Sequence, residues 1–220
     1  MSKRLAAAFS VALLSTITLA PMAHAADEVT VGKHAGAIIV NLRGTVVDPV
    51  GSSPILTAAG GATGLSATAD SSVVPSLGIS YFFTDNIAAE LILATSEHSI
   101  SAVSSSGSTL VHKTWVLPPV VSLQYHFAPH SQFSPYVGAG VNYMIFYSGK
   151  DYNGFTVRPH DGFGAAVEGG ADFAVNKRVN VNVDVKKVFF RTDADINGGA
   201  FKSHVHLDPW VISAGLGVKF

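Results

Sequence analysis

Apolar residues in this chain alternate with small or polar residues over most of its length, and this alternation constrains the fold more than any other feature. A period of two residues is typical of β-strands that have one apolar face. Beyond residue 26 there is no run of about 18 apolar residues, the length that predicts a membrane-spanning helix. The alternation predicts eight strands, at residues 33–47, 73–83, 87–100, 111–127, 135–148, 160–175, 179–195 and 203–220.

The composition decides what kind of β-protein this is. Hydrophobic residues make up 48% of the chain and charged residues only 13%, whereas about 25% of residues are charged in a typical soluble domain. A soluble β-sandwich also alternates, but its exposed face would need far more charge. The net charge of −1 gives no electrostatic indication of nucleic-acid binding. The chain is therefore predicted to be all-β, an eight-stranded antiparallel transmembrane β-barrel.

The connections between the predicted strands support this interpretation. Short connections at 84–86, 128–134 and 176–178 alternate with longer polar ones at 48–72, 101–110, 149–159 and 196–202. Short periplasmic turns and long outer loops are typical of bacterial outer-membrane barrels. Aromatic residues occur at strand ends, as they do at membrane interfaces. They are Tyr81, Phe83, Tyr125, Phe127 and Phe220 at one end, with Trp115, Tyr143 and Tyr147 toward the other.

The two ends of the chain carry signals for export and assembly. Lys3 and Arg4 precede an apolar segment, Leu5 to Leu19, and Ala23-His24-Ala25 fits a small-x-small cleavage site. This order predicts a signal peptide at residues 1–25 and a barrel domain at 26–220. The apolar run is too short to be a comfortable membrane anchor. The terminal Phe220 is predicted to be a signal for the outer-membrane assembly machinery, which places the barrel in the bacterial outer membrane.

Five sequence blocks follow one another along the chain: Phe83-Thr84-Asp85-Asn86-Ile87-Ala88-Ala89-Glu90-Leu91, Leu117-Pro118-Pro119, Gln124-Tyr125-His126-Phe127, Pro135-Tyr136-Val137-Gly138-Ala139-Gly140-Val141-Asn142-Tyr143 and Leu207-Asp208-Pro209-Trp210-Val211. In sequence and in order they resemble the OmpW family of outer-membrane proteins, and the resemblance spans residues 81 to 220. The resemblance implies a narrow eight-stranded barrel. It also implies the passage of small hydrophobic molecules across the outer membrane, with membrane lipids and such a ligand as partners.

Charged residues on the predicted inward face suggest that the lumen is filled. An eight-stranded barrel has an interior barely wide enough for side chains, so a wide aqueous pore is excluded. Both signs of charge occur there, which favours a plug of ion pairs over a conduction path. The predicted plug residues are Arg43, Glu90, Glu168, Asp172, Asp184 and Lys186, and Lys219 lies on the same face of the last strand.

Toward the outer end the inward face becomes apolar, which predicts a pocket for a hydrophobic ligand. The pocket residues are Val116, Val120, Met144, Phe146, Phe190, Val205, Leu207 and Val211. Pro118 and Pro119 interrupt the fourth strand, and proline lacks the N–H that a β-ladder requires. They predict either a lateral gate into the bilayer or a bulge that only adjusts curvature. The family resemblance favours the gate.

Two other functions are compatible with the sequence. One is a structural or adhesion barrel with 48–72 and 101–110 as its contact surface. The other is a lipid-modifying enzyme using His98-Ser99 or Ser122 with His126, although no third group is placed to orient the base. His204 and His206 share a face, but no carboxylate pattern accompanies them. We therefore expect no catalytic residue, no metal and no cofactor.

Overall fold

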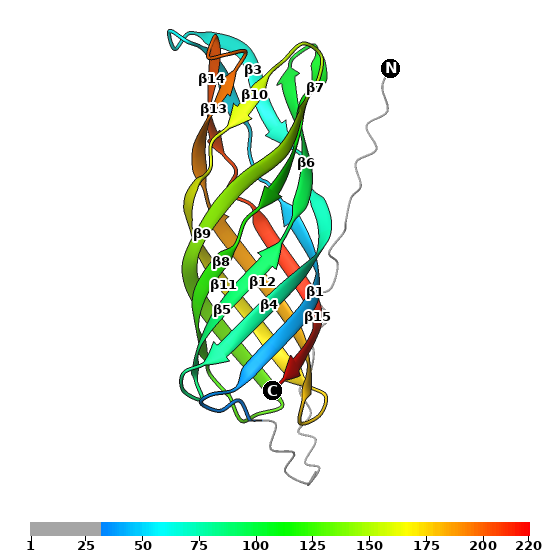
Figure 1. Cartoon of the computed structure of the whole chain (residues 1–220), viewed down its shortest axis with the longest axis vertical. Coiled ribbons are helices and arrows are strands. Elements are labelled where there is room, and N and C mark those ends of the chain that lie inside the picture. Colours follow the sequence, from blue (N-terminus) through cyan, green and yellow to red (C-terminus); the bar gives the residue numbers. More distant parts are fainter. Residues whose placement is uncertain (1–31) are drawn as a thin grey trace.

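The computed structural model describes residues 32–220, and the predicted signal peptide lies outside this part. Residues 32–220 contain no helix long and apolar enough to cross a membrane. They form fifteen antiparallel strands (Figure 1). These are β1 (Ile38–Asp48), β2 (Ser53–Thr57), β3 (Ala62–Ala69), β4 (Ser72–Phe82), β5 (Ile87–Ala94), β6 (Ser96–Ser104), β7 (Gly107–Leu117), β8 (Val120–His126), β9 (Phe133–Asp151), β10 (Val157–Pro159), β11 (Gly162–Ala174), β12 (Val179–Phe189), β13 (Arg191–Ile196), β14 (Phe201–His206) and β15 (Trp210–Lys219).

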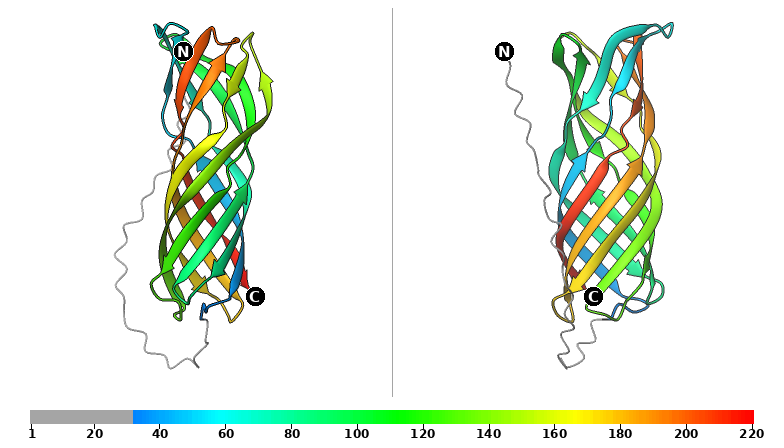
Figure 2. Two further views of the ribbon diagram at one scale, coloured as in Figure 1. Left: turned by 60° about the vertical axis from the view of Figure 1, so that its left-hand side comes forward. Right: turned by 180° about the vertical axis from the view of Figure 1, so that it is seen from behind.

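The lower part of the molecule is a closed ring of eight antiparallel strands, which we call the lower tier. Its order is β1-β4-β5-β8-β9-β11-β12-β15, and β15 pairs back to β1. The ring closes at the end of the chain, where the Phe220 amide donates to the carbonyl of Ile38 at 2.8 Å. The tilted strands surround the axis in every view (Figure 2). The predicted eight-stranded antiparallel barrel is confirmed.

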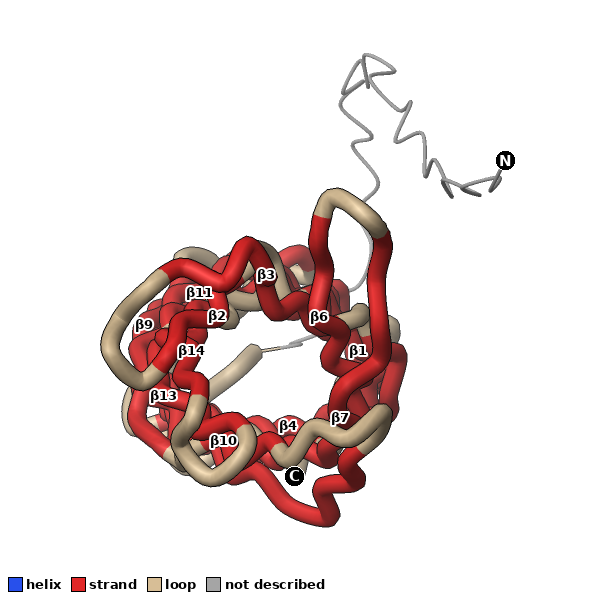
Figure 3. The backbone as a smooth tube through the Cα atoms, turned by 90° about the horizontal axis from the view of Figure 1, so that it is seen from above, coloured by secondary structure: helices blue, strands red, loops and turns tan. Residues whose placement is uncertain are grey.

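The remaining strands continue the same eight strands upward and form the upper tier. β2 and β3 extend β1 and β4, and β6 and β7 extend β5 and β8, in the way that β10, β13 and β14 extend β11, β12 and β15. Only β9 of the described strands runs through both tiers without a break. Seen along the axis, the strands form a ring around an interior (Figure 3).

Apolar side chains face outward and polar ones inward in the lower tier, as the alternation predicts. Leu42 is 65% exposed and Leu123 is 58% exposed, whereas the neighbouring Arg43 and Gln124 are each only 2% exposed. This is the reverse of a soluble protein, and it is stable when the surrounding medium is lipid.

Exposed aromatic side chains form two groups along the barrel axis. At the lower end the ring centroids of Tyr125 and Phe127 lie 5.2 Å apart. Toward the upper end Tyr143 pairs with Phe163, at 4.5 Å between centroids. Aromatic belts at both interfaces are typical of transmembrane barrels.

The prediction of long upper loops was wrong. Segment 48–72 contains β2 and β3, and the upper connections are short turns at 58–61, 105–106, 152–156 and 197–200. Residues 53–69 consist mainly of Ala, Ser, Thr and Gly, so they show no alternation of large apolar residues. Pairing with β14 and β6 makes them strands instead. The turns use backbone with positive φ, as at Asn197, Gly198 and Gly199.

Two further boundaries differ from those predicted. The first strand begins at Ile38 rather than at residue 33, so Lys33 precedes it. Seven of the eight long strands are interrupted between the tiers, and several interruptions contain proline, as at Pro49, Pro118-Pro119 and Pro209. Proline cannot donate a ladder hydrogen bond. We call this ring of interruptions the waist.

Candidate ligand-binding site

The lower tier is filled by a network of charged side chains centred on Lys186. Its ammonium lies 2.9 Å from the Asp184 carboxylate and 3.0 Å from that of Glu90, and it also contacts Glu168. Each of these four side chains is at most 1% exposed. One ammonium therefore joins carboxylates from β5, β11 and β12 across the width of the barrel.

Further groups complete the coordination of these carboxylates. The Arg43 guanidinium lies 2.7 Å from Glu90, and the Tyr136 hydroxyl donates to Asp184 at 2.9 Å. The amide of Gln124 donates to Glu168 at 2.8 Å. Buried charges are tolerated only when they are paired and hydrogen-bonded. The structure thus joins five of the six predicted plug residues, Arg43, Glu90, Glu168, Asp184 and Lys186, in one network.

The sixth predicted plug residue, Asp172, lies in a second cluster nearer the lower end. Lys33 enters the lumen from below β1, and its ammonium lies 2.6 Å from Asp172. Asn180 and Asn182 donate to the other oxygen of Asp172 at 2.7 and 2.8 Å. Lys219 is not part of this cluster, because its ammonium donates to the carbonyl of Gly32.

The two clusters together obstruct the axis of the lower tier. They hold three basic side chains and four carboxylates, so their formal charges nearly balance. The basic residues are Lys33, Arg43 and Lys186, and the acidic ones are Glu90, Glu168, Asp172 and Asp184. A molecule moving straight down the barrel would have to separate these pairs, which is costly in a site that excludes water.

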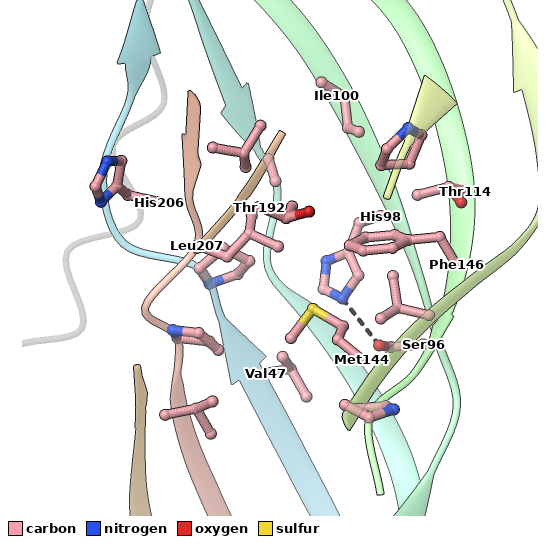
Figure 4. Close-up of a pocket in the computed structure, with 18 of the residues that line it drawn as sticks. Val47, Ser96, His98, Ile100, Thr114, Met144, Phe146, Thr192, His206 and Leu207 are labelled. Carbon is pink, nitrogen blue, oxygen red and sulfur yellow. Dashed lines mark hydrogen bonds between the residues drawn. The ribbon is translucent and has the colours of Figure 1, made fainter. Parts of the chain in front are cut away.

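Above this plug lies a cavity with a volume of about 120 Å³. Figure 4 shows part of its wall, including Met144, Phe146 and Leu207. Seven of the eight predicted pocket residues line it: Val116, Val120, Met144, Phe146, Val205, Leu207 and Val211. The eighth, Phe190, is fully buried in the apolar cluster that includes Met144, and its ring packs 6.2 Å from that of Phe146. Lys186 also belongs to the cavity lining, so the plug reaches the cavity.

The strand interruption at Pro118-Pro119 has different consequences on its two sides. Toward β9 the pairing continues, since the Tyr143 amide donates to the carbonyl of Pro119 at 3.1 Å. Toward β5 and β6 the paired residues stop at Ile92↔Val120 and resume at Ser96↔Val116. The two registers are continuous, which places Pro118 opposite Ala94. The side chains of both residues line the cavity.

A second interruption lies between β9 and β10. No ladder joins these two strands in residues 32–220, and side-chain bonds to Asp151 join them instead. The Asp151 carboxylate accepts the Val157 amide at 3.0 Å and pairs with Arg158 at 2.9 Å and His112 at 2.7 Å. The contacts with Val157 and Arg158 join β9 to β10, whereas His112 holds Asp151 from β7 on the other side of β9.

The other candidate residues from the sequence fall in different places. Ser122 and His126 belong to the plug, where Ser122 donates to Glu168 and His126 contacts Lys33. His98 faces the cavity and pairs with Ser96, which the sequence did not single out, rather than with Ser99. The exposed His204 pairs with Asp193 at 2.5 Å. Within the described chain, no group of three or more His, Cys, Asp or Glu side chains is arranged to hold a metal ion.

Sequence reasoning missed three functional contributors. Lys33 stands at the start of the first predicted strand, 33–47, and its partner Asp172 is 139 positions away. Tyr136 was visible only as part of a family block, although its position on the inward face of an alternating strand is a usable signal. Ser96 lies where polar residues interrupt the alternation of the third strand, and such an interruption is the sequence sign of a strand break.

A closed barrel with an apolar exterior, aromatic belts and a filled polar interior defines the class of small outer-membrane β-barrels. Comparison with known proteins agrees with this class. The model of the OmpW family matches residues 34–220. A Sinorhizobium fredii protein named "Uncharacterized outer-membrane protein y4mB" is 40% identical over 214 residues, covering 95% of this chain and 90% of that protein.

Two further relatives connect this chain to characterised barrels. Outer membrane protein W of Escherichia coli is 35% identical over 154 residues, covering 66% of this chain and 71% of that protein. The crystal structure of OprG from Pseudomonas aeruginosa superposes with a TM-score of 0.81 at 32% identity, covering 86% of this chain and 98% of that chain. The chain belongs to the OmpW family and is a barrel of the bacterial outer membrane.

The plug yields a prediction about stability. Lys186→Met should lower the free energy of unfolding by about 3–5 kcal/mol, because it leaves three buried carboxylates without their shared cation. The matched control is Lys177→Met, which removes the same charge from an exposed turn and should change stability by less than about 1 kcal/mol. Urea unfolding of both variants in lipid vesicles measures the difference. Equal effects would mean that the lumen is wet and the plug assignment is wrong.

Proposed function

We propose that this barrel mediates the passage of small hydrophobic molecules across the outer membrane, through the apolar cavity and out sideways into the bilayer. The observation that carries the proposal is the position of the cavity directly above the charged plug. An apolar ligand that enters from outside contacts the apolar wall of the cavity. Below the cavity, Lys186 and its carboxylates block its way. Because the axial path ends there, the remaining exit is through the wall of the barrel.

The cavity supports a small ligand of this kind. Its volume of about 120 Å³ is close to that of an apolar cavity of roughly 150 Å³ that binds benzene in another protein. Apolar side chains from both tiers line it, among them Ile55, Val116 and Met144. Transfer of an apolar molecule into such surroundings is favourable at about 25 cal/mol per Å² of surface buried.

The exit that we propose lies between Ala94 and Pro118. No ladder pairing joins residues 93–95 to 117–119, and we call this unpaired stretch the interval. Pro118 has no N–H that could donate across it. Unpaired backbone in hydrocarbon needs a covering group. The hydroxyls of Thr95 and Tyr147 hydrogen-bond to each other beside this interval. The gap between β9 and β10 is the less suitable exit because the Asp151 carboxylate joins the two strands through Val157 and Arg158.

This proposal is for a channel without catalytic residues. The adhesion alternative has less support than the sequence suggested, since segments 48–72 and 101–110 are mostly strand and leave only short turns at the top of the barrel.

The proposed exit predicts different effects on uptake for substitutions of Pro118 and Pro119. Pro118→Val supplies an N–H opposite Ala94, and valine favours strands. The interval should then pair, gaining about 0.5–1.5 kcal/mol per hydrogen bond, while passage of an apolar tracer falls several-fold. The measurement is the uptake of N-phenylnaphthylamine by cells that make each variant, beside unfolding of the purified barrels.

The matched control is Pro119→Val, which adds its N–H on the side of β9 where Tyr143 already pairs. It should leave uptake close to that of the unaltered barrel. If Pro118→Val folds and transports the tracer undiminished, the lateral exit at this interval is wrong, and the prolines only shape the strand.

We also propose that Phe220 is read by the outer-membrane assembly machinery. Its side chain is 74% exposed, so it contributes little packing to the folded barrel, while its backbone pairs with Ile38. Phe220→Ala keeps that backbone and should reduce the yield of heat-modifiable barrel in the outer membrane without lowering its urea midpoint. Phe173→Ala, an exposed aromatic within β11, is the control. Equal yields for both variants would contradict the role of Phe220.

A further inference from the structure

A buried serine–histidine pair faces the largely apolar cavity from β6. Ser96 is 1% exposed and His98 is 6% exposed, and both belong to the cavity lining. Figure 4 shows the His98 ring directed toward Ser96, beside Met144 and Phe146. Ser96 pairs with Val116 at the upper edge of the interval opposite Pro118. The pair therefore lies on the path that we propose for the ligand.

The backbone fixes which nitrogen of His98 carries hydrogen. Nδ1 lies 2.7 Å from the main-chain carbonyl oxygen of Asp70. A carbonyl oxygen only accepts hydrogen bonds, so Nδ1 must be the donor. Asp70 is itself held, because its amide donates to the Ser99 carbonyl at 3.1 Å and its carboxylate accepts the Ser99 amide at 2.5 Å. The ring orientation is thus set by the junction between β3 and β6.

This tautomer decides what Ser96 presents to a ligand. In the neutral ring Nε2 is an acceptor, and it lies 2.9 Å from Ser96 Oγ. Ser96 must then donate its only hydroxyl hydrogen to His98. The lone pairs of Ser96 Oγ therefore remain available on the cavity side. Within residues 32–220, Ser96 Oγ makes no other hydrogen bond.

Three other hydroxyl groups of the cavity wall also donate their hydrogen to an acceptor within the protein. Thr114 donates to the Tyr147 carbonyl at 3.3 Å, Thr192 to that of His160 at 2.7 Å, and Ser203 to that of Pro54 at 3.1 Å. Their hydrogens point to backbone rather than to the cavity. A ligand group that can only accept hydrogen bonds would face lone pairs at these positions.

We propose that Ser96 and His98 form a recognition site for a hydrogen-bond donor, so that the barrel prefers small apolar molecules carrying one hydroxyl or N–H group. The inference rests on the proposed function and adds the chemical class of its ligand. A site that pairs with a donor rejects an isosteric molecule without one, because the buried acceptor is left unpaired.

The test compares indole with benzofuran, which has the same bicyclic shape with an ether oxygen in place of the N–H. Binding of each compound to the full barrel is measured in nanodiscs. Indole should bind about tenfold more tightly than benzofuran. In Ser96→Ala the two affinities should become nearly equal. His98→Leu releases the Ser96 hydrogen, so benzofuran should gain affinity.

Ser99→Ala is the matched control, since Ser99 is on the same strand but does not line the cavity; it should keep the tenfold preference. Equal affinities in the unaltered barrel, or a preference that survives Ser96→Ala in a folded protein, would overturn this inference and leave the proposed function standing. Failure of the unaltered barrel to bind either compound would overturn the proposed function and this inference with it.

Discussion

The ammonium of Lys186, shared among the carboxylates of Glu90, Glu168 and Asp184, is the interaction on which the rest of this structure depends. An eight-stranded barrel must fill its interior with side chains, and here the filling is charged and nearly balanced. The same contacts that hold three strands together across the lumen obstruct its axis. In the function that we propose, a molecule binds above this network and does not leave below it.

The waist is the second constraint. Below it the strands pair in a continuous ring around polar side chains, and above it the upper tier surrounds an apolar interior. Prolines at the change of tier remove ladder donors where the cavity meets the wall. At Pro118 the strand is unpaired toward Ala94, and both residues line the cavity. At Pro119, one residue further, the bond from Tyr143 keeps the wall closed.

The parts of this fold that alternate strictly were predictable. The strand from Val179 and the strand that ends at Phe220 have large apolar residues at nearly every second position. They predicted the fold class and the inward face, and with it Asp184 and Lys186 of the plug. The upper tier was not predictable from this signal, because β2 and β3 are made of small and hydroxylated residues whose strand character comes from their neighbours. Lys33 and Ser96 were missed for a related reason. Lys33 depends on Asp172, which only the closed barrel brings to it. His98 is a near neighbour of Ser96 in the sequence, but the carbonyl of Asp70 that orients its ring reaches it only when β3 and β6 pair.

The claim that most needs a direct measurement is that ligand leaves the cavity between Ala94 and Pro118. The chain contains no cysteine, so a barrel carrying Thr95→Cys and Leu117→Cys would hold one pair of thiols across the interval. These two residues are opposite each other in the same register, and their replacement leaves Pro118 in place. Residues opposite each other in a sheet are close enough for a disulfide. Uptake of the apolar tracer is measured with the pair oxidised and again after reduction of the same sample. Lateral exit predicts that oxidation blocks uptake and that reduction restores it; uptake unaffected by the cross-link would contradict the account.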